Sequence, residues 1–413
     1  MRRQKELIIV GFLELVAVVL ARWQALGGVR TDEAKYLLNI PYPHPPLMRW
    51  LMSMTEFLSF QEMFWRILLA TLMIQAVWLV WDMTRLRPRA TDGQARTLHQ
   101  QDRIMISAGW LFSTAVLVQA GSVVLALIVA MEALVFIWLR TRPELCKKIP
   151  YGIGLFWLAT VFTAFQSVLF FPLVWHILRR AHRSRTESFF LTFAPFALLT
   201  LWSLSNPLAI ATMVIHADGG ASGSVIERLM VVGKLWIIGG AGVISVVGTY
   251  GILRSRDWYL IASFILVCAY VTASVPYPFY AILFTPLLIG GLVHLFAGRR
   301  HPGAFPLLAC MISASAILTW FSRPPERMGP AREVMAAISG LGSGWDVGSG
   351  SVLIAGSFGH DWQYESRSEV RRYKPELVKT ASAIVCLSAC EPMFDTNGWK
   401  QLKDVRSETW VRR

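Results

Sequence analysis

The chain has 413 residues, of which 54% are hydrophobic and 16% charged, and its formal net charge is +14 at pH 7. A soluble protein of this length would carry more charge, and recurring apolar stretches of roughly 17–25 residues are typical of a multi-spanning membrane protein. The positive residues cluster in short segments between these stretches, which is the pattern of cytoplasmic loops and argues against a nucleic-acid-binding surface.

The N-terminal segment has a basic start followed by an apolar run over residues 6–23. This run is longer than that of a signal peptide, and no small-residue cleavage site follows it. We therefore expect a retained first membrane helix with its N-terminus in the cytoplasm.

Further apolar runs follow along the chain, at approximately 63–82, 104–119, 123–139, 152–178, 188–204, 229–252, 258–274, 279–297 and 304–321. The linkers between them that are rich in Arg and Lys are predicted to face the cytoplasm; they read RLRPRATDGQARTLHQQDR, RTRPELCKK, RRAHRSR, RSRD and GRR.

The run at 152–178 has a basic segment on both sides, KKIP before it and RRAHRSR after it. A single crossing would put one of these outside and invert all later helices. We therefore predict a hairpin of two short helices that turns near Thr163 to Gln166 and is shielded by protein or lies where the membrane is thin. The scheme gives about eleven membrane helices, with the C-terminus outside.

Two longer loops are predicted to face outward, over about 23–61 and 205–227. Beyond residue 322 the composition becomes polar, and the pattern predicts buried strands at SVLIAGSFG and SAIVCLSAC, a candidate third strand at ETWVRR and a helix at GPAREVMAAISGLG. We expect an all-α polytopic membrane domain over 1–322, which includes the first outer loop, and a small extracytoplasmic α/β domain over 323–413.

The cysteines form no CxxC pair and no metal-ligand spacing. Cys386 and Cys390 are four residues apart, a spacing that a helix allows to be bridged and a strand does not. Two unrelated thiols are the simpler interpretation.

The first outer loop places Asp32 and Glu33 directly before Lys35 and Tyr36, and a proline-rich segment with His44 follows. Prolines restrict the backbone, so this segment is pre-organised. LMRWLMSMTEFLSF then has the pattern of an amphipathic interfacial helix. The pattern indicates a carboxylate site at the outer membrane surface, and a solvated loop is the alternative.

At these positions the sequence resembles the protein O-mannosyltransferase family and its GT-C-fold relatives that use polyprenyl-phosphate sugars, such as the aminoarabinose transferases. The matching residues are Asp32, Glu33, Tyr36, His44, Pro45, Pro46, Leu47 and Arg49, and VPYPFYAILFTPLLIGGL, which contains Tyr280 and Pro286, is similar to the late-helix pattern of the family. The resemblance implies transfer of a sugar from a polyprenyl-phosphate donor to an acceptor hydroxyl on the outer face of the membrane.

The chain departs from this pattern where relatives often carry a cation. Gln166 stands where many have a Lys in the hairpin, and Phe279 stands where many have an Arg before the late-helix Tyr. The cation that binds the donor phosphate would then come from another position, and the candidates are Lys35, Arg49, Arg228 and Lys234. Interfacial snorkelling is the alternative interpretation for the last two.

Relatives also often carry a second acidic residue near the fourth helix, where this chain offers only Glu132. An intramembrane carboxylate indicates function, but pairing inside the bundle is the alternative. His216 and Asp218 in the second outer loop are candidates to line the same cavity. His44, His216 and a carboxylate are residue types that can bind a metal, but nothing in their spacing requires one, so no cofactor is implied.

The chemistry assigns Asp32 as the general base for the acceptor hydroxyl and Glu33 as the residue that orients Asp32 or the acceptor. A cation would stabilise the leaving phosphate, and direct displacement would invert the anomeric carbon. The expected partners are a polyprenyl-phosphate sugar and a protein, lipid or glycan acceptor at the plasma (inner) membrane, with no nucleic acid. The alternatives are a lipid-linked glycan transporter or flippase, which would more often show repeats and mid-membrane charges, and a catalytically inactive scaffold.

Overall fold

The computed structural model describes residues 2–40, 44–85, 99–181, 184–211, 224–274, 277–296, 304–322, 333–334, 337, 351–355, 359–366, 369–387, 394, 397–402 and 408–412. The chain divides into two compact units. The first comprises Met1–Arg22, Tyr42–Leu51 and Phe64–Arg323, and the second comprises Trp23–Pro41, Met52–Met63 and Pro324–Arg413.

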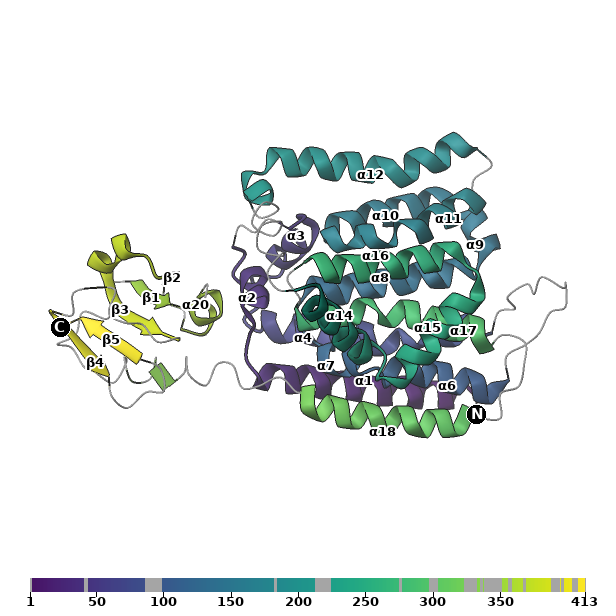
Figure 1. Ribbon diagram of the computed structural model, residues 1–413, viewed down its shortest axis with the longest axis horizontal. Helices are drawn as coiled ribbons and strands as arrows, with labels where there is room; N and C mark the ends of the chain where they lie inside the picture. Colours follow the sequence, from purple (N-terminus) through teal and green to yellow (C-terminus); the bar gives the residue numbers. More distant parts are fainter. Residues whose placement is uncertain are drawn as a thin grey trace. The chain divides into compact units, whose positions relative to one another are not determined.

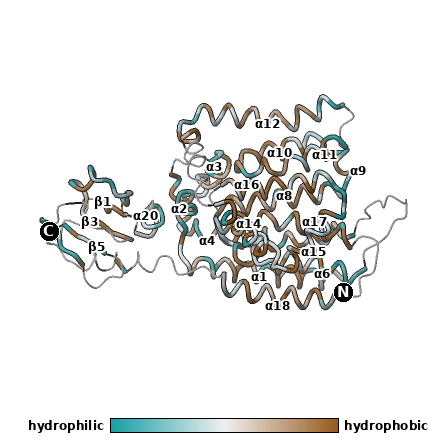
Figure 2. Tube along the Cα trace, viewed as in Figure 1, coloured by the Kyte–Doolittle hydropathy of each residue, from teal (hydrophilic) through white to brown (hydrophobic). Residues whose placement is uncertain are grey.

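The first unit is a bundle of helices (Figure 1), and Figure 2 shows that apolar residues dominate most of their length. The helices of the chain up to residue 322, including those that cross between the units, are α1 (Arg2–Leu26), α2 (Thr31–Leu37), α3 (Leu47–Ser53), α4 (Gln61–Gln75), α5 (Val77–Met83), α6 (Gln100–Leu111), α7 (Thr114–Gln119), α8 (Leu125–Arg140), α9 (Pro143–Lys148), α10 (Pro150–Thr163), η1 (Phe165–Phe170), α11 (Phe171–Ala181), α12 (Arg185–Ser205), α14 (Val225–Gly239), α15 (Val243–Ser255), α16 (Trp258–Ala273), η2 (Pro278–Leu283), α17 (Thr285–Phe296) and α18 (Ala304–Ser322).

Fewer helices meet the length and hydropathy expected of a membrane span than the sequence predicts. Among the described residues, Gln61–Met83, Arg185–Ser205 and Pro278–Phe296 meet it, with a fourth span if α14 and α15 count as one. The predicted number of about eleven is therefore not confirmed. The run 152–178 turns after α10, the run 229–252 bends between α14 and α15, and the run 258–274 forms a helix of only 16 residues.

The predicted hairpin is present at 152–178. α10 ends at Thr163, Ala164 is extended, and η1 leads into α11, which packs against α10. α11 also packs against α9, whose basic residues precede α10. Both basic flanks therefore lie at one end of the pair, which we call the basic end, and the turn lies at the other, which we call the turn end.

The predicted continuous run 229–252 is wrong as a single helix, because α14 and α15 meet at an angle of 100°. At the break, Gly242 has a φ of +69°, and a Cβ on Gly239 would lie 2.6 Å from the Ala281 carbonyl oxygen. The hydroxyls of Ser113 and Thr285 each donate to the Gly239 carbonyl at 2.7 Å. These side chains satisfy a backbone group that the broken helix leaves unpaired, which is required inside a membrane.

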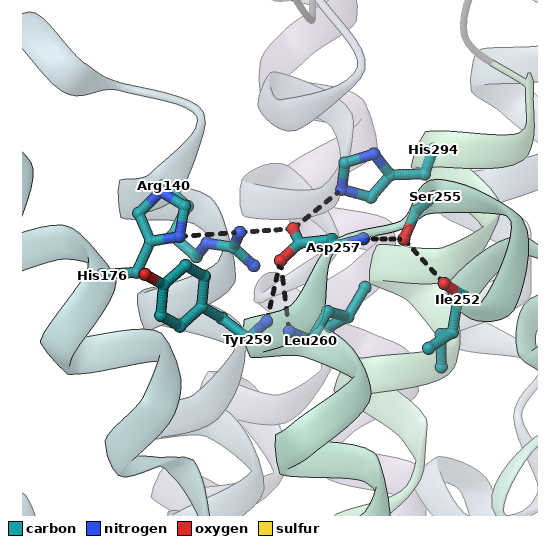
Figure 3. A network of polar contacts seen from close by, with 8 residues as sticks. All are labelled: Arg140, His176, Ile252, Ser255, Asp257, Tyr259, Leu260 and His294. Atoms are coloured by element: carbon teal, nitrogen blue, oxygen red, sulfur yellow. Dashed lines mark hydrogen bonds and ion pairs between the residues drawn. The ribbon is translucent and has the colours of Figure 1, made fainter.

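A polar network ties helix ends together at the basic end (Figure 3). Asp257 caps α16 by accepting the backbone N–H groups of Tyr259 and Leu260 at 3.2 Å each. Its other carboxylate oxygen pairs with Arg140 at the end of α8, and His294 of α17 lies 3.6 Å from it. Burial would raise the pKa of Asp257, which precedes α16, but the Arg140 guanidinium and the hydrogen bonds outweigh burial and hold this pKa below its ordinary value.

The second unit contains a five-stranded sheet in the order β2-β1-β3-β5-β4. β1 is parallel to β2 and β3, whereas β5 is antiparallel to β3 and β4. The three predicted strands are confirmed as β1, β3 and β5, while most of the predicted helix GPAREVMAAISGLG lies outside the described residues. The elements of this part are β1 (Ser351–Ala355), α20 (His360–Ser366), β2 (Val370–Arg372), η3 (Pro375–Thr380), β3 (Ala381–Cys386), β4 (Trp399–Leu402) and β5 (Glu408–Arg412).

Cys386 ends β3 and is disulfide-bonded. The interpretation of Cys386 as an unrelated thiol is therefore wrong. Cys390 lies outside the described residues.

The first outer loop contributes Trp23–Pro41 and Met52–Met63 to the second unit, whereas we predicted it as part of the membrane domain. α2 packs against α20, and Tyr364 of α20 contacts an apolar cluster formed by Val29, Ala34 and Leu37. The Tyr364 hydroxyl also donates to Glu62 at 3.1 Å. Burial of these apolar side chains explains why this loop belongs with the C-terminal sheet.

Candidate active site

The predicted base, Asp32, lies in the first turn of α2. Its carboxylate accepts a hydrogen bond from the Lys35 ammonium at 3.3 Å, one turn further along the same helix. The side chain of Asp32 is 26% exposed and that of Lys35 11% exposed. Asp32 thus combines partial access to solvent with a fixed partner, which suits a group that takes a proton from an acceptor. Lys35, predicted as a phosphate ligand, is engaged with this carboxylate.

Glu33 has a different setting from its neighbour. It is buried, at 1% exposure, and its carboxylate accepts the backbone N–H of Arg30 at 2.8 Å. This bond caps the start of α2, where an acidic side chain also complements the helix dipole. Tyr36 is also buried, at 6% exposure. The geometry gives Glu33 a role in holding α2 in place, and through α2 the position of Asp32.

The histidine of the proline-rich segment lies in the first unit. The rings of His44 and Phe165 are 6.1 Å apart, so His44 lies at the turn end beside η1. Pro45 and Pro46 after it are buried. The helix predicted over residues 47–60 is shorter than expected, because α3 ends at Ser53.

A cluster of neutral polar side chains occupies the turn end of the first unit. The Gln166 side-chain amide donates to the hydroxyls of Tyr270 at 2.9 Å and Tyr280 at 3.4 Å, and the Tyr270 hydroxyl donates to that of Tyr280 at 3.1 Å. Gln166 and Tyr280 are about 5% and 6% exposed. We call Gln166, Tyr270 and Tyr280 the turn cluster. The turn cluster joins η1 of the hairpin to α16 and η2. The resemblance leads us to expect phosphate-binding cations in the hairpin, at Gln166, and directly before Tyr280.

Glu132 lies near the turn cluster, on α8. One of its carboxylate oxygens accepts the Thr163 hydroxyl at 2.9 Å, at the end of α10. The other oxygen is inaccessible to solvent and has no hydrogen-bond partner among the described residues. Glu132 therefore faces the hairpin turn rather than the basic end, and its bond to Thr163 is a pairing inside the bundle.

The remaining predicted site residues are placed by the helices that carry them. Arg228 is partly buried and Lys234 is exposed on α14, which packs against η2, the element that carries Tyr280. Arg49 is partly buried on α3. His216 and Asp218 lie outside the described residues.

Among the described residues, no group of three or more His, Cys, Asp or Glu side chains is arranged to hold a metal ion. Thr163 and Tyr270 were not predicted as polar partners inside the bundle. Their signal was a hydroxyl within the last turn of an apolar run, which is common and becomes informative only once the neighbouring helices are known.

No family model matches the chain, and no curated protein matches it either. The structure is similar to two crystal structures of ArnT from Cupriavidus metallidurans. The one with undecaprenyl phosphate bound has a TM-score of 0.64 at 12% identity and covers 98% of each chain. The apo structure has a TM-score of 0.64 at 14% identity and covers 100% of this chain and 98% of that chain. The chain has the fold of these ArnT structures, mostly helical with a small C-terminal sheet, so the predicted helical architecture is confirmed, whereas the predicted number of membrane helices is not.

Proposed function

We propose that the chain is a membrane glycosyltransferase that moves a sugar from a polyprenyl-phosphate donor to an acceptor hydroxyl on the outer face of the membrane. The observation that carries this proposal is the likeness to ArnT over nearly the whole chain, with undecaprenyl phosphate bound in one of the ArnT structures described above. The acidic pair after the first helix adds the chemical group that the reaction needs.

In the proposed reaction Asp32 accepts the proton of the attacking hydroxyl, the new glycosidic bond forms as the bond from the anomeric carbon to the phosphate oxygen breaks, and polyprenyl phosphate leaves with the electron pair. Direct displacement inverts the anomeric carbon. Arg228 or Lys234 stabilises the negative charge on the leaving phosphate. The hydroxyls of the turn cluster supply neutral donors at the late helix. The reaction as proposed draws on no metal, and the acceptor is a protein, lipid or glycan.

The proposed topology is a multi-pass protein of the plasma (inner) membrane with a cytoplasmic N-terminus and an extracytoplasmic C-terminal domain. Two observations favour it. The hairpin returns both of its basic flanks to one end, as expected if that end faces the cytoplasm. Cys386 is disulfide-bonded, and structural disulfides form and persist mainly outside the cytoplasm.

The test of the proposed function is Asp32→Asn in sugar transfer from a polyprenyl-phosphate donor, with the protein in liposomes. Loss of a general base costs about 10²–10⁴-fold in rate, while donor lipid binding should stay unchanged because Asn keeps the shape of the side chain. His44→Ala should cause a smaller loss of rate. A wild-type rate for Asp32→Asn would refute the role of Asp32 as the general base and favour the scaffold or transporter alternatives.

A catalytically inactive scaffold of the same fold is the second candidate. The observation that favours it is the neutral turn cluster, in which Gln166 and Tyr280 carry no cation. A wild-type protein that binds polyprenyl phosphate and transfers no sugar would establish this alternative.

A further inference from the structure

The helix α20 of the C-terminal domain presents two side chains toward α2 of the first outer loop. His360 and Tyr364 are four residues apart, so they lie on the same face of α20. Tyr364 contacts the apolar cluster on and before α2, which fixes this face against α2. His360 is therefore held beside the helix that carries Asp32 and Lys35, and it interacts electrostatically with both of them.

The surroundings of His360 favour the neutral imidazole. Its Nδ1 atom is inaccessible to solvent and has no hydrogen-bond partner among the described residues, so protonating this atom would bury an unpaired N–H. Burial and the Lys35 ammonium lower the pKa of His360 below its ordinary value of 6.5, against the opposing effect of Asp32. α20 also packs against β2, whose Arg371 pairs with Glu369.

We propose that His360 is a positioning residue for Asp32, so that the C-terminal domain contributes a side chain to the site of sugar transfer. This inference rests on the proposed function for its role in catalysis, but the coupling of His360 to Asp32 and Lys35 stands apart from it. The neutral imidazole lies on the face of α20 that packs against α2 and adds no positive charge beside the Asp32 carboxylate.

A charged imidazolium in the same place would act in the opposite way. It would repel the Lys35 ammonium and attract the Asp32 carboxylate, which would become a weaker base and turn away from the acceptor. Transfer should therefore fall as His360 gains a proton, at a pH below about 6.5. The C-terminal domain would then set the acid side of the pH profile.

The first experiment measures the pKa of His360 in the full chain, in detergent, from the pH dependence of hydrogen–deuterium exchange at the imidazole Cε1 carbon. Lys35→Met removes the cation and should raise this pKa, whereas Asp32→Asn removes the anion and should lower it. His99, an exposed histidine before α6, serves as the internal control and should not respond. A His360 pKa that is the same in the wild type and both variants would overturn the proposal, whether or not the protein transfers sugar.

The second experiment measures transfer against pH for His360→Gln, His360→Lys and the matched control His99→Gln. His360→Gln should lower kcat about tenfold through lost positioning of the base, leave the KM for the donor within about twofold, and remove the part of the acid limb due to His360. His360→Lys, which places a permanent cation there, should lower kcat further at every pH. If His360→Gln keeps the kcat and the pH profile of the wild type, the positioning role of His360 is refuted. If the wild-type protein itself transfers no sugar at any pH, the proposed function is refuted, and the pKa measurement alone decides whether His360 is coupled to Asp32 and Lys35.

Discussion

The ion pair between Arg140 and Asp257 should contribute substantially to the stability of the first unit. The two side chains are only 12% and 10% exposed, and Asp257 also caps α16. Asp257→Asn keeps an N-cap residue but leaves the Arg140 guanidinium without its counter-charge. Breaking a buried pair in this way costs about 3–5 kcal/mol, and because this pair is not fully buried we expect roughly 2–4 kcal/mol.

A matched control lies at the same end of the bundle. Arg142 pairs with Asp82, and these side chains are 31% and 29% exposed. Asp82→Asn should cost only about 0.2–1 kcal/mol, as expected for a pair in contact with water. The measurement is the free energy of unfolding in mixed detergent–SDS micelles. Equal losses for Asp257→Asn and Asp82→Asn would refute the reasoning from burial.

The same pair predicts how stability depends on pH. The pKa of Asp257 is lower in the folded protein than its ordinary value of 3.8, so the stabilisation is fully present above about pH 5 and is lost as the pH falls through the lowered pKa. The difference in free energy of unfolding between the wild type and Asp257→Asn should therefore be constant near neutrality and shrink below about pH 4. A difference that grows on acidification would contradict the assigned sign.

Three further predictions concern the proposed site and the topology. Glu33→Ala should lose the cap of α2 and about 1–2 kcal/mol of stability, whereas Glu33→Gln retains an acceptor and should lose less; equal thermal stability of Glu33→Ala and the wild type would exclude the capping role. Arg228→Ala or Lys234→Ala should weaken donor lipid binding by about 2–3 kcal/mol, as expected for a lost charge-assisted contact, and unchanged affinity in both would direct attention to Arg49. A reporter that is active only outside the cytoplasm, fused after Arg413, should be active. Labelling of Cys386 by a cytoplasmic thiol reagent after mild reduction would contradict the predicted extracytoplasmic placement of the C-terminal domain.

The sequence by itself determined the features that depend on local composition. The apolar runs and their basic flanks predicted a helical membrane protein, and the flanks of 152–178 predicted a hairpin with a turn at Thr163 to Gln166, where the structure has it. Strands β1, β3 and β5 followed from short apolar runs bounded by turn residues. The acidic pair and the His-Pro-Pro segment were recognisable because they stand together, with an aromatic residue between them, in the pattern that resembles the O-mannosyltransferase family.

The tertiary structure decided which of these residues act together, because side-chain partners depend on packing between segments far apart in the chain. Asp32 and Glu33 are adjacent in sequence, yet one is partly exposed beside Lys35 and the other is buried at the cap of α2. The run 229–252 looks continuous, but hydroxyls from α6–α7 and α17 stabilise a break in it that no local pattern announces. The first outer loop joins the C-terminal unit because apolar side chains on and before α2 pack against Tyr364, about 330 residues further along the chain.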